Sequence, residues 1–256
     1  MIKKIYKKLI PEKKRIHIHI FINKMTSFLY RGNNFYCNCC NRSFRKFKPK
    51  GNTLVVRKNA ECPYCGSLER VRNLLFYLEN ETDIFTGNYR LLHFAPEWPL
   101  LPIFKKNKKL DHITADINPN VAEYQIDITN ITFPDNSFDY IICSHVLGHV
   151  SDEKKAIKEL YRVLKNDGTA LVATLIDLKN PHTFETVEAD TPKKRLLYYS
   201  ESDLLRLHGV DFCDRLAKGG FNVKTINYPL VLGKEIQQKC ALGNGNRELI
   251  FKCTKS

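Results

Sequence analysis

Residues 113–150 constrain the fold most, because a short apolar run followed by a polar residue occurs three times within them. The runs end at Asp116, at Asp127 and at Ser144-His145. Short apolar runs bounded by turn residues are typical of strands buried on both faces of a parallel sheet. Open α/β sheets bind ligands beyond the carboxyl ends of their strands, so we expect these polar residues to share one binding rim.

Strand-like and helix-like segments alternate from residue 89 to the end of the chain. The predicted strands are 90–94, 113–115, 124–126, 138–143, 169–174, 222–227 and 248–253. The predicted helices are 67–80, with Ser67 as its cap, 100–104, and 154–164, which is expected to stop at Asn166-Asp167-Gly168. This alternation predicts an α/β fold, with a mainly parallel seven-stranded sheet and helices on both faces.

The positive charge of the chain lies in its first 60 residues. They hold 16 Lys and Arg against one acid, Glu12, whereas residues 61–256 carry a net charge of −1. A basic surface of this kind attracts phosphates, and its partner is either an anionic membrane surface or RNA. Residues 1–30 alternate apolar and basic side chains, which fits a helix lying on lipid, a phosphate clamp or a solvated tail.

Four of the nine cysteines form two Cys-x-x-Cys pairs, Cys37, Cys40, Cys62 and Cys65. The two pairs are separated by 21 residues, a spacing that predicts a zinc-ribbon-like module over residues 35–66. Four thiolates leave no open position for water, so the expected Zn²⁺ is structural. Cys39 is a further thiol that could replace Cys40, although the spacing favours Cys40. The alternative is two unrelated reduced pairs.

Three segments are therefore expected. Residues 1–34 form a basic extension, residues 35–66 the zinc-ribbon-like module, and residues 67–256 the α/β domain. No apolar stretch approaches the length that spans a membrane, and the basic N-terminus lacks the apolar core of a secretory leader. The expected location is cytoplasmic, with peripheral contact to the inner face of the membrane left open.

The polar residues of the rim suit an adenosine-like ligand. A carboxylate at the end of the second strand, Asp116, can accept two hydrogen bonds from the vicinal hydroxyls of a ribose. An acid followed by an apolar residue, Asp127-Ile128, suits the exocyclic amine and the ring face of an adenine. Either acid alone would equally fit a turn or a helix cap.

Residues 133–150 (FPDNSFDYIICSHVLGHV) and 156–168 (AIKELYRVLKNDG) resemble a known family. They are similar to the motifs FDxVxxxxVLEHV and RVLxPGG of class I S-adenosylmethionine-dependent methyltransferases of the type 11-like group. The resemblance covers residues 89–174 closely and the rest of the α/β domain loosely. It implies a Rossmann-like fold and S-adenosyl-L-methionine as the cofactor.

The resemblance also implies which residues hold the cofactor. The expected contacts are Asp116 at the ribose, Asp127 with Ile128 at the adenine, and the first turn, with His93, Ala95 and Glu97, at the methionine moiety. Ile117 and Ser144 are further expected cofactor-binding residues. Within that turn, Ala95 would allow close approach and Glu97 would take the cofactor's amino group.

Segments 62–70, 91–99 and 209–221 resemble a bacterial subgroup in which a basic segment and a cysteine pair precede the methyltransferase domain. Members of that subgroup are linked to polysaccharide biosynthesis. Two departures from the broad family stand out. The turn 93–99 (HFAPEWP) contains no glycine, and Gly148 occupies the position of a usual Glu, so a catalytic metal is not expected.

The expected reaction is O-methylation of a glycan or another small-molecule acceptor. A hydroxyl acceptor must lose a proton, for which His145 is the first candidate base and His149, one helical turn on, the second. Either histidine could instead be structural. Residues 176–202 are expected to form a lid over the acceptor. The alternatives are a zinc-ribbon rRNA or other RNA methyltransferase, and a non-catalytic scaffold with a degenerate cofactor turn.

Overall fold

The computed structural model describes residues 12–243, 245 and 248–255. Its helices are α2 (Glu12–Thr26), η1 (Ser27–Tyr30), α3 (Glu69–Glu81), α4 (Leu101–Lys106), η2 (Leu147–His149), α5 (Glu153–Val163), α6 (Pro192–Tyr199), α7 (Phe212–Ala217) and α8 (Tyr228–Lys239). Its strands are β1 (Arg31–Cys37), β2 (Arg42–Phe44), β3 (Lys48–Gly51), β4 (Val56–Glu61), β5 (Tyr89–Phe94), β6 (Leu110–Asp116), β7 (Tyr124–Gln125), β8 (Phe138–Ser144), β9 (Leu164–Ala173), β10 (Asn222–Ile226) and β11 (Ile250–Thr254).

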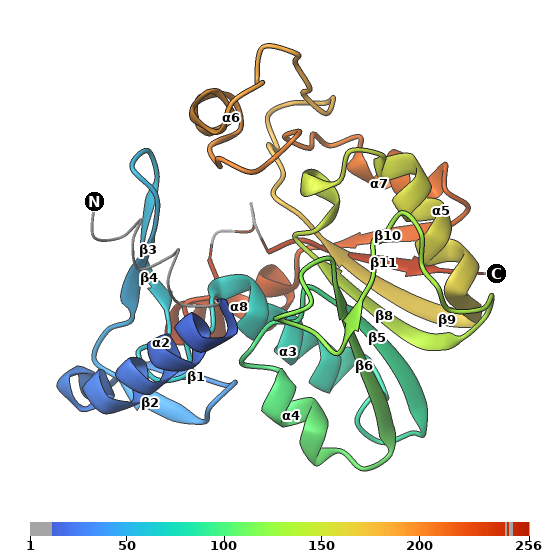
Figure 1. The fold of residues 1–256 in the computed structure, drawn as a ribbon. Coiled ribbons are helices and arrows are strands. Elements are labelled where there is room, and N and C mark those ends of the chain that lie inside the picture. The colour runs from blue at the N-terminus through green and yellow to red at the C-terminus, as the bar shows by residue number, and fades with distance from the viewer. Residues whose placement is uncertain (1–11, 244, 246–247, 256) are drawn as a thin grey trace.

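The main sheet has seven strands in the order β10-β11-β9-β8-β5-β6-β7 (Figure 1). Strands β9, β8, β5, β6 and β7 are parallel, and β11 runs antiparallel to both of its neighbours, β9 and β10. The prediction of a mainly parallel, seven-stranded Rossmann-like sheet is confirmed. The parallel order brings the ends of β5, β6, β7 and β8 to one edge, which is where a ligand site is expected.

Helices cover both faces of this sheet, because successive side chains of a strand point to opposite sides. On one face, α5 and α7 pack on a core that includes Leu92, Ile141 and Val172. On the other face, α3, α4 and α8 pack on a core that includes Leu91 and Ile142. The sheet is thereby buried on both sides, as its near-continuous apolar strands require.

Two short hairpins, β1-β2 and β3-β4, form a small module before the main domain. Its core holds Cys37, Phe44, Phe47 and Cys62. The fully buried Arg72 of α3 joins the module to the rest of the chain, since its guanidinium donates to the carbonyls of Ala60, Ser67, Cys240 and Ala241. Five N–H groups in a fixed fork make Arg suited to such a junction.

Two local expectations are wrong. Ser67 does not cap α3, which begins at Glu69 after Leu68, because the Ser67 hydroxyl lies 3.2 Å from Cys37 Sγ and 3.3 Å from Cys65 Sγ. The helix does not continue to Asn166-Asp167-Gly168, because α5 ends at Val163 and β9 begins at Leu164, five residues before the predicted strand. Asp167 lies within β9 with φ 61°, and its N–H donates to Lys255 O at 2.9 Å, which ties this end of β9 to the C-terminal segment.

The segment that contains α6 rises above the main sheet, beside the β3–β4 hairpin (Figure 1). Asn52 Nδ2 in the hairpin loop donates to Ser200 O at 2.6 Å, so the two parts are in direct contact. Among the described residues, no helix combines the length and the apolar character needed to cross a membrane.

Candidate cofactor and active site

A cavity of about 510 Å³ opens at the carboxyl ends of β5, β6, β7 and β8. Its wall is formed by Phe94, Ala95, Asp116, Ile117, Ile126, Asp127, Ile128, Thr129, His145, Val146, His149, Val150, Ser151 and Asp203. Seven of the ten residues predicted for cofactor binding or catalysis are among them. The cavity therefore joins segments that are far apart in the chain at the rim that the strand pattern predicts.

The chain leaves β5 and β8 through left-handed residues. Ala95 has φ 46° and donates its N–H to Ala115 O at 3.0 Å, and His145 has φ 56° and donates its N–H to Ala173 O at 2.7 Å. A non-glycine residue in this region costs roughly 1–2 kcal/mol. The sheet maintains both turns through these hydrogen bonds, and the small Ala95 side chain lets the backbone line the cavity without a glycine.

The two acids of the rim are held by turns of their own. Asp116 Oδ1 accepts from the N–H of Asn118 at 2.7 Å, and Asp127 Oδ1 accepts from the N–H and the hydroxyl of Thr129, both at 2.8 Å. Such turns fix the direction of a carboxylate. Both acids line the cavity on successive parallel segments, β6 and the residues after β7.

Two isoleucines follow these acids and give the cavity its apolar surfaces. Ile117 exposes 68% of its surface, whereas Ile128 exposes only 5%. An exposed Ile at the edge of a cavity leaves apolar area that a planar ring could cover. Carboxylates next to apolar side chains suit a ligand with hydroxyls, an amine and a flat ring. The hydrogen-bond acceptors and the apolar surface of this wall therefore fit adenosine.

The structure places His93, Glu97 and Ser144 behind the cavity wall. His93 is fully buried, and its Nε2 lies 2.7 Å from Glu97 Oε2. Burial alone would raise the pKa of Glu97, but hydrogen bonds from His93 and Ser144 and the nearby charge of Arg70 lower it. In this conformation Glu97 is an internal counter-charge, and its expected contact with a cofactor stays a prediction.

The two candidate bases lie in the wall on either side of Val146. His149 Nδ1 lies 3.1 Å from the carbonyl of Asp203 and 3.8 Å from its carboxylate. A carbonyl only accepts, so this contact requires the proton of neutral His149 on Nδ1 and leaves Nε2 able to take a proton. The expectation that both histidines belong to one site agrees with their placement.

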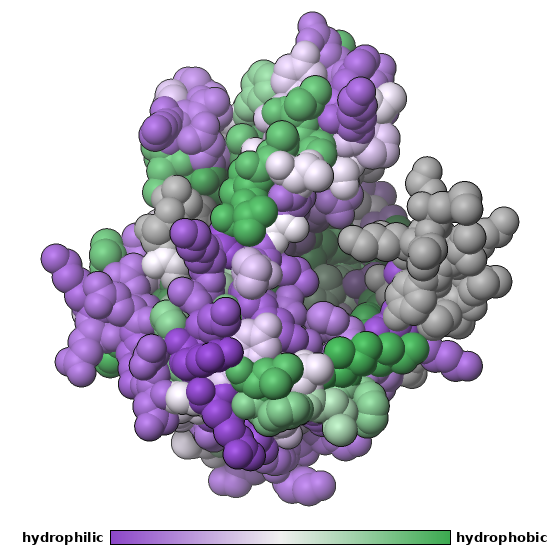
Figure 2. Space-filling model, turned by 90° about the vertical axis from the view of Figure 1, so that its left-hand side faces the viewer, coloured by the Kyte–Doolittle hydropathy of each residue, from purple (hydrophilic) through white to green (hydrophobic). Residues whose placement is uncertain are grey.

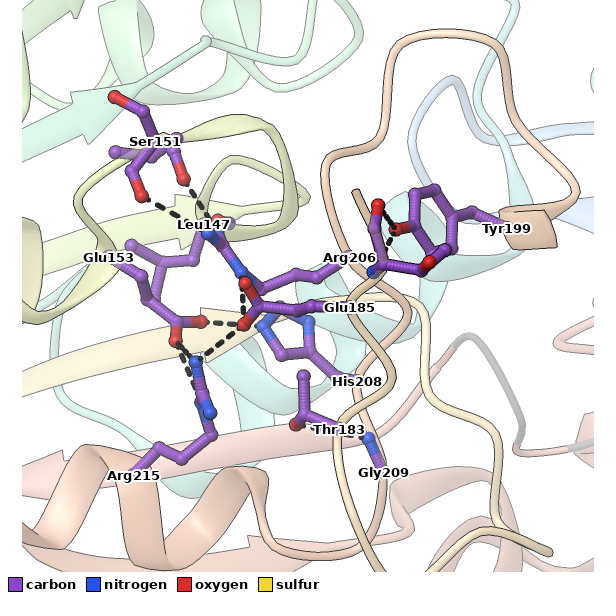
Figure 3. A network of polar contacts seen from close by, with 12 residues as sticks. Leu147, Ser151, Glu153, Thr183, Glu185, Tyr199, Arg206, His208, Gly209 and Arg215 are labelled. Carbon is purple, nitrogen blue, oxygen red and sulfur yellow. Dashed lines mark hydrogen bonds and ion pairs between the residues drawn. The ribbon is translucent and has the colours of Figure 1, made fainter. Parts of the chain in front are cut away.

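A buried arginine shapes the loop that carries His149 (Figure 3). Arg206, 4% exposed, donates to the carbonyls of Leu147 at 3.0 Å, Val150 at 2.5 Å and Ser151 at 3.1 Å. Its Nε donates to Glu185 Oε1 at 3.0 Å. Because Val150 and Ser151 line the cavity, this guanidinium links the segment after α6 to the cavity wall.

A second buried contact lies beneath this loop (Figure 3). His208 Nε2 lies 2.5 Å from Glu153 Oε1, and Arg215 Nε donates to the other oxygen of Glu153 at 2.7 Å. Burial lowers the pKa of His208, and the Glu153 carboxylate opposes that shift. These residues come from three separate segments, so no pattern in the sequence predicts that they meet.

The segment after β9 also explains Gly148. A Cβ at Gly148 would lie 2.7 Å from Leu204 Cδ2, and Leu205 N–H donates to Gly148 O at 2.9 Å. Leu204 is 4% exposed, so it has little room to move. The resembling family carries Glu at this position. Here the side chain of Leu204 fills the space that a side chain at position 148 would need.

Several polar residues of the expected lid contact one another. Tyr199 is fully buried with its hydroxyl near the backbone of Thr186, and Tyr198 contacts Glu188. Within this part of the chain Asp203, one residue beyond the expected range 176–202, lines the cavity. No pattern in the sequence marks Asp203, because its place depends on how the whole segment folds back.

The four predicted cysteines come together in the N-terminal module. Their Sγ atoms all lie within 4.8 Å of one another, with 3.6 Å between Cys37 and Cys65 and 3.8 Å between Cys40 and Cys62. A tetrahedral Zn²⁺ with Zn–S bonds of about 2.3 Å separates its sulfurs by about 3.8 Å. The donor set therefore fits a zinc ion, and Cys39 lies outside it.

The comparisons with known proteins find similarity in the central part of the chain. Residues 100–172 match the family model described as a methyltransferase domain. The uncharacterized methyltransferase YcgJ of Bacillus subtilis is 45% identical over 53 residues, 21% of each chain. The ubiquinone/menaquinone biosynthesis C-methyltransferase UbiE of Enterobacter is 45% identical over 53 residues, again 21% of each. The chain thus matches about a fifth of the length of these curated relatives.

Solved structures of similar fold are more distant in sequence. The structure of YcgJ from Bacillus subtilis is 17% identical, has a TM-score of 0.45, and the match covers 66% of this chain and 93% of that one. A SAM-dependent methyltransferase from Archaeoglobus fulgidus is 15% identical with a TM-score of 0.49, covering 74% and 95%. The family match confirms the methyltransferase resemblance of the central segment.

Proposed function

We propose that this chain is an S-adenosylmethionine-dependent methyltransferase whose cofactor occupies the cavity at the ends of β5, β6, β7 and β8. The observation that carries the proposal is the convergence of Asp116, Asp127 and two isoleucines on one cavity of about 510 Å³. The methyltransferase domain match over residues 100–172 supports it, since that segment includes β6, β7 and β8.

Five of the wall residues have a part in the proposed binding of the cofactor. Asp116 accepts hydrogen bonds from the ribose hydroxyls, and Asp127 accepts from the adenine amine. Ile117 and Ile128 cover the ring, and the backbone of Ala95 borders the methionine end. When bound, S-adenosylmethionine supplies a methyl group on a positively charged sulfur that departs as a neutral thioether. The remaining task of the protein is to hold the acceptor in line and to exclude water.

For the acceptor, we propose a hydroxyl of a glycan or another small molecule. His149 supports this choice, because its contact with the Asp203 carbonyl leaves Nε2 as the proton acceptor. His145, the first candidate base from the sequence, lines the same cavity and is the alternative to His149. Residues 61–256 carry a net charge of only −1. Such a near-neutral domain favours a small acceptor over RNA at this cavity, because RNA binding depends on cationic side chains.

We also propose that Cys37, Cys40, Cys62 and Cys65 bind a structural Zn²⁺. Support comes from the Sγ separations of 3.6 and 3.8 Å, which suit tetrahedral thiolate ligation. Two of the four cysteines, Cys37 and Cys62, are fully buried, so water has little access to the cluster. A closed site of this kind stabilises a fold and performs no chemistry.

The test of cofactor binding is calorimetry with S-adenosylhomocysteine, the product form, on the native protein and two variants. Asp116→Asn removes a charge-assisted contact worth about 1.5–3 kcal/mol, so binding should weaken roughly tenfold to a hundredfold. Asp111→Asn changes an exposed acid at the opposite end of β6 and should leave binding unchanged. Absence of binding by the native protein would contradict the proposal and favour a scaffold.

The acceptor proposal has a separate readout. With a glycan or small hydroxyl acceptor, His149→Gln should lower turnover while leaving the affinity for S-adenosylhomocysteine within a factor of about two. Its pH profile should lose the limb that reports the base. If His149→Gln turns over as fast as the native enzyme and His145→Gln does not, the base is His145.

A further inference from the structure

The N-terminal helix α2 turns its apolar side toward solvent. Ile18, Phe21, Ile22 and Met25 are spaced i, i+3, i+4 and i+7, and they expose 38%, 65%, 50% and 60% of their surfaces. At 3.6 residues per turn these four side chains lie within about 100° of one another around the helix axis. A surface helix of a globular protein normally buries such a stripe.

Polar contacts hold the opposite side of α2 against the protein. Asn23, 1% exposed, accepts a hydrogen bond from Lys48 Nζ at 2.7 Å. His19 Nε2 lies 3.0 Å from Glu61 Oε1, and Lys50 Nζ donates to Glu61 Oε2 at 2.6 Å. The orientation of α2 is therefore fixed by the β3–β4 hairpin, and its outward apolar face is a property of the folded module.

The exposed stripe continues past the end of α2. Phe28 and Leu29 of η1 expose 59% and 54% of their surfaces. Figure 2 views the molecule from the side of α2 and the two hairpins, and it shows green apolar atoms at the surface beside purple hydrophilic ones, at the height of α2. We call these six side chains, Ile18, Phe21, Ile22, Met25, Phe28 and Leu29, the apolar stripe.

The chain segment that carries the apolar stripe is basic. Residues 13–60 contain 12 Lys and Arg and no acid. Lys14 lies one turn before Ile18 on the same side of α2 and is exposed. Lys24 is also exposed, outside the sector of the stripe, and its Nζ lies 5.9 Å from the centre of the Tyr64 ring. Exposed apolar side chains framed by cations are the pattern of a helix that lies in the interface of an anionic bilayer.

We propose that α2 and η1 dock this protein on an anionic lipid surface, with the apolar stripe inserted at the boundary of headgroups and acyl chains. A second copy of the chain is a poorer occupant, because a two-fold contact would set the same basic segment against itself. RNA could neutralise the cations and stack bases on the two phenylalanines, but it would leave Ile18, Ile22 and Leu29 in water. This docking is independent of the proposed methyl transfer and would place a methyltransferase next to acceptors at a membrane.

The test is co-sedimentation of the full chain with vesicles of phosphatidylcholine alone or with about a third phosphatidylserine. The native protein should bind the anionic vesicles, bind neutral ones weakly, and dissociate at about 0.5 M salt. The variant Phe21→Gln/Ile22→Gln/Met25→Gln should lower the partition coefficient at least about tenfold. Glutamine keeps the helix propensity of α2, so the fold is expected to survive.

The matched control is Leu230→Gln/Val231→Gln/Ile236→Gln on α8. These residues are also apolar and exposed, at 66%, 66% and 39%, but they lie on another helix. This variant should bind vesicles like the native protein. Equal loss in both triple variants would overturn the proposal, because it would show general surface hydrophobicity. Unchanged binding of the α2 variant would overturn it as well.

Two other outcomes would reassign the surface. If the native protein is a dimer that the α2 variant converts to a monomer, and vesicles do not bind, the occupant is a second copy. If RNA binds with a strong salt dependence and vesicles do not, the cations serve nucleic acid. Either result overturns lipid docking, and neither depends on whether S-adenosylhomocysteine binds.

Discussion

Arg206 shows how one buried side chain can determine the shape of a ligand site. Its guanidinium donates to three carbonyls of residues 147–151. No local sequence motif predicts this contact. A buried charged group with unsatisfied partners is costly, so the loop and the arginine depend on each other. The conformation of the cavity wall that carries His149 therefore depends on the hydrogen bonds of Arg206.

We expect Arg206→Lys to lower the free energy of unfolding by about 2–3 kcal/mol, because an ammonium cannot reach all three carbonyls in the geometry of a guanidinium. It should also weaken binding of S-adenosylhomocysteine severalfold. Urea unfolding and calorimetry measure the two effects. Arg195→Lys is the control, since Arg195 contacts Ala189 O away from the cavity. Lost stability with unchanged binding would show that Arg206 is structural only.

The lowered pKa of His112 predicts that the stability of the protein depends on pH. Burial and the neighbouring His93, whose Nδ1 lies 3.3 Å from His112 Nε2, lower the pKa of His112 to about 3. The unfolded chain takes up a proton near pH 6.5 but the folded chain does not, so stability is full above pH 6.5 and falls as the pH drops toward 3.

Below pH 6.5, His112 lowers the free energy of unfolding by at most about 1.4 kcal/mol per pH unit. Urea unfolding of the native protein and of His112→Gln between pH 7 and pH 4 measures it. Since other groups titrate alike in both proteins, the native protein should lose stability more steeply than the variant. Parallel curves would mean that folded His112 binds protons normally.

At the scale of elements, the segment after β9 and the η2 turn pack as one unit. Gly148 has no side chain, and Leu204 occupies the space where one would be. This explains why the strand-four motif of this chain departs from the resembling family at that position. Tertiary packing against a distant segment, and not the local turn, excludes a larger residue.

Gly148→Ala should therefore destabilise the protein by about 1–3 kcal/mol, through overpacking against Leu204. In a Leu204→Ala background the same change should cost less than about 0.5 kcal/mol, because the clash is gone. Thermal or urea unfolding of the four proteins completes the cycle. Additive effects would show that Gly148 and Leu204 do not interact.

At the scale of the whole molecule, the cysteine module and the main domain are coupled through α3. Arg72 donates to carbonyls of both the module and the segment after α8, and Ser67 sits between the thiols and α3. Loss of the module should therefore affect the main domain as well. Ligand thiolates and a bound metal would contribute to the folding free energy directly.

Cys62→Ser should remove about one equivalent of zinc per chain and lower the melting temperature by roughly 10 °C or more. Cys39→Ser, which changes a thiol outside the cluster, should retain both metal and melting temperature. Metal analysis by mass spectrometry and thermal unfolding provide the readouts. Full zinc content in Cys62→Ser would contradict the proposed ligand set.

The sequence by itself determined the alternation of elements, the seven-stranded sheet and the strand ends at which Asp116, Asp127 and His145 lie. These features follow from local apolar periodicity and from the rule that parallel strands share one carboxyl edge. The two Cys-x-x-Cys pairs likewise define their own cluster, because two residues between thiols allow both to face one ion.

Only the tertiary structure decided the rest. The sequence predicts the turn 93–99 as a cofactor loop, and the fold adds the contact of His93 Nε2 with the buried Glu97 Oε2, because a buried carboxylate needs hydrogen-bond partners. Asp203 and Arg206 reach the site from a segment without periodicity, so no pattern places them. The outward face of α2 depends on Asn23 and His19 bonding to the β3–β4 hairpin, a contact between residues distant in sequence that no local rule predicts.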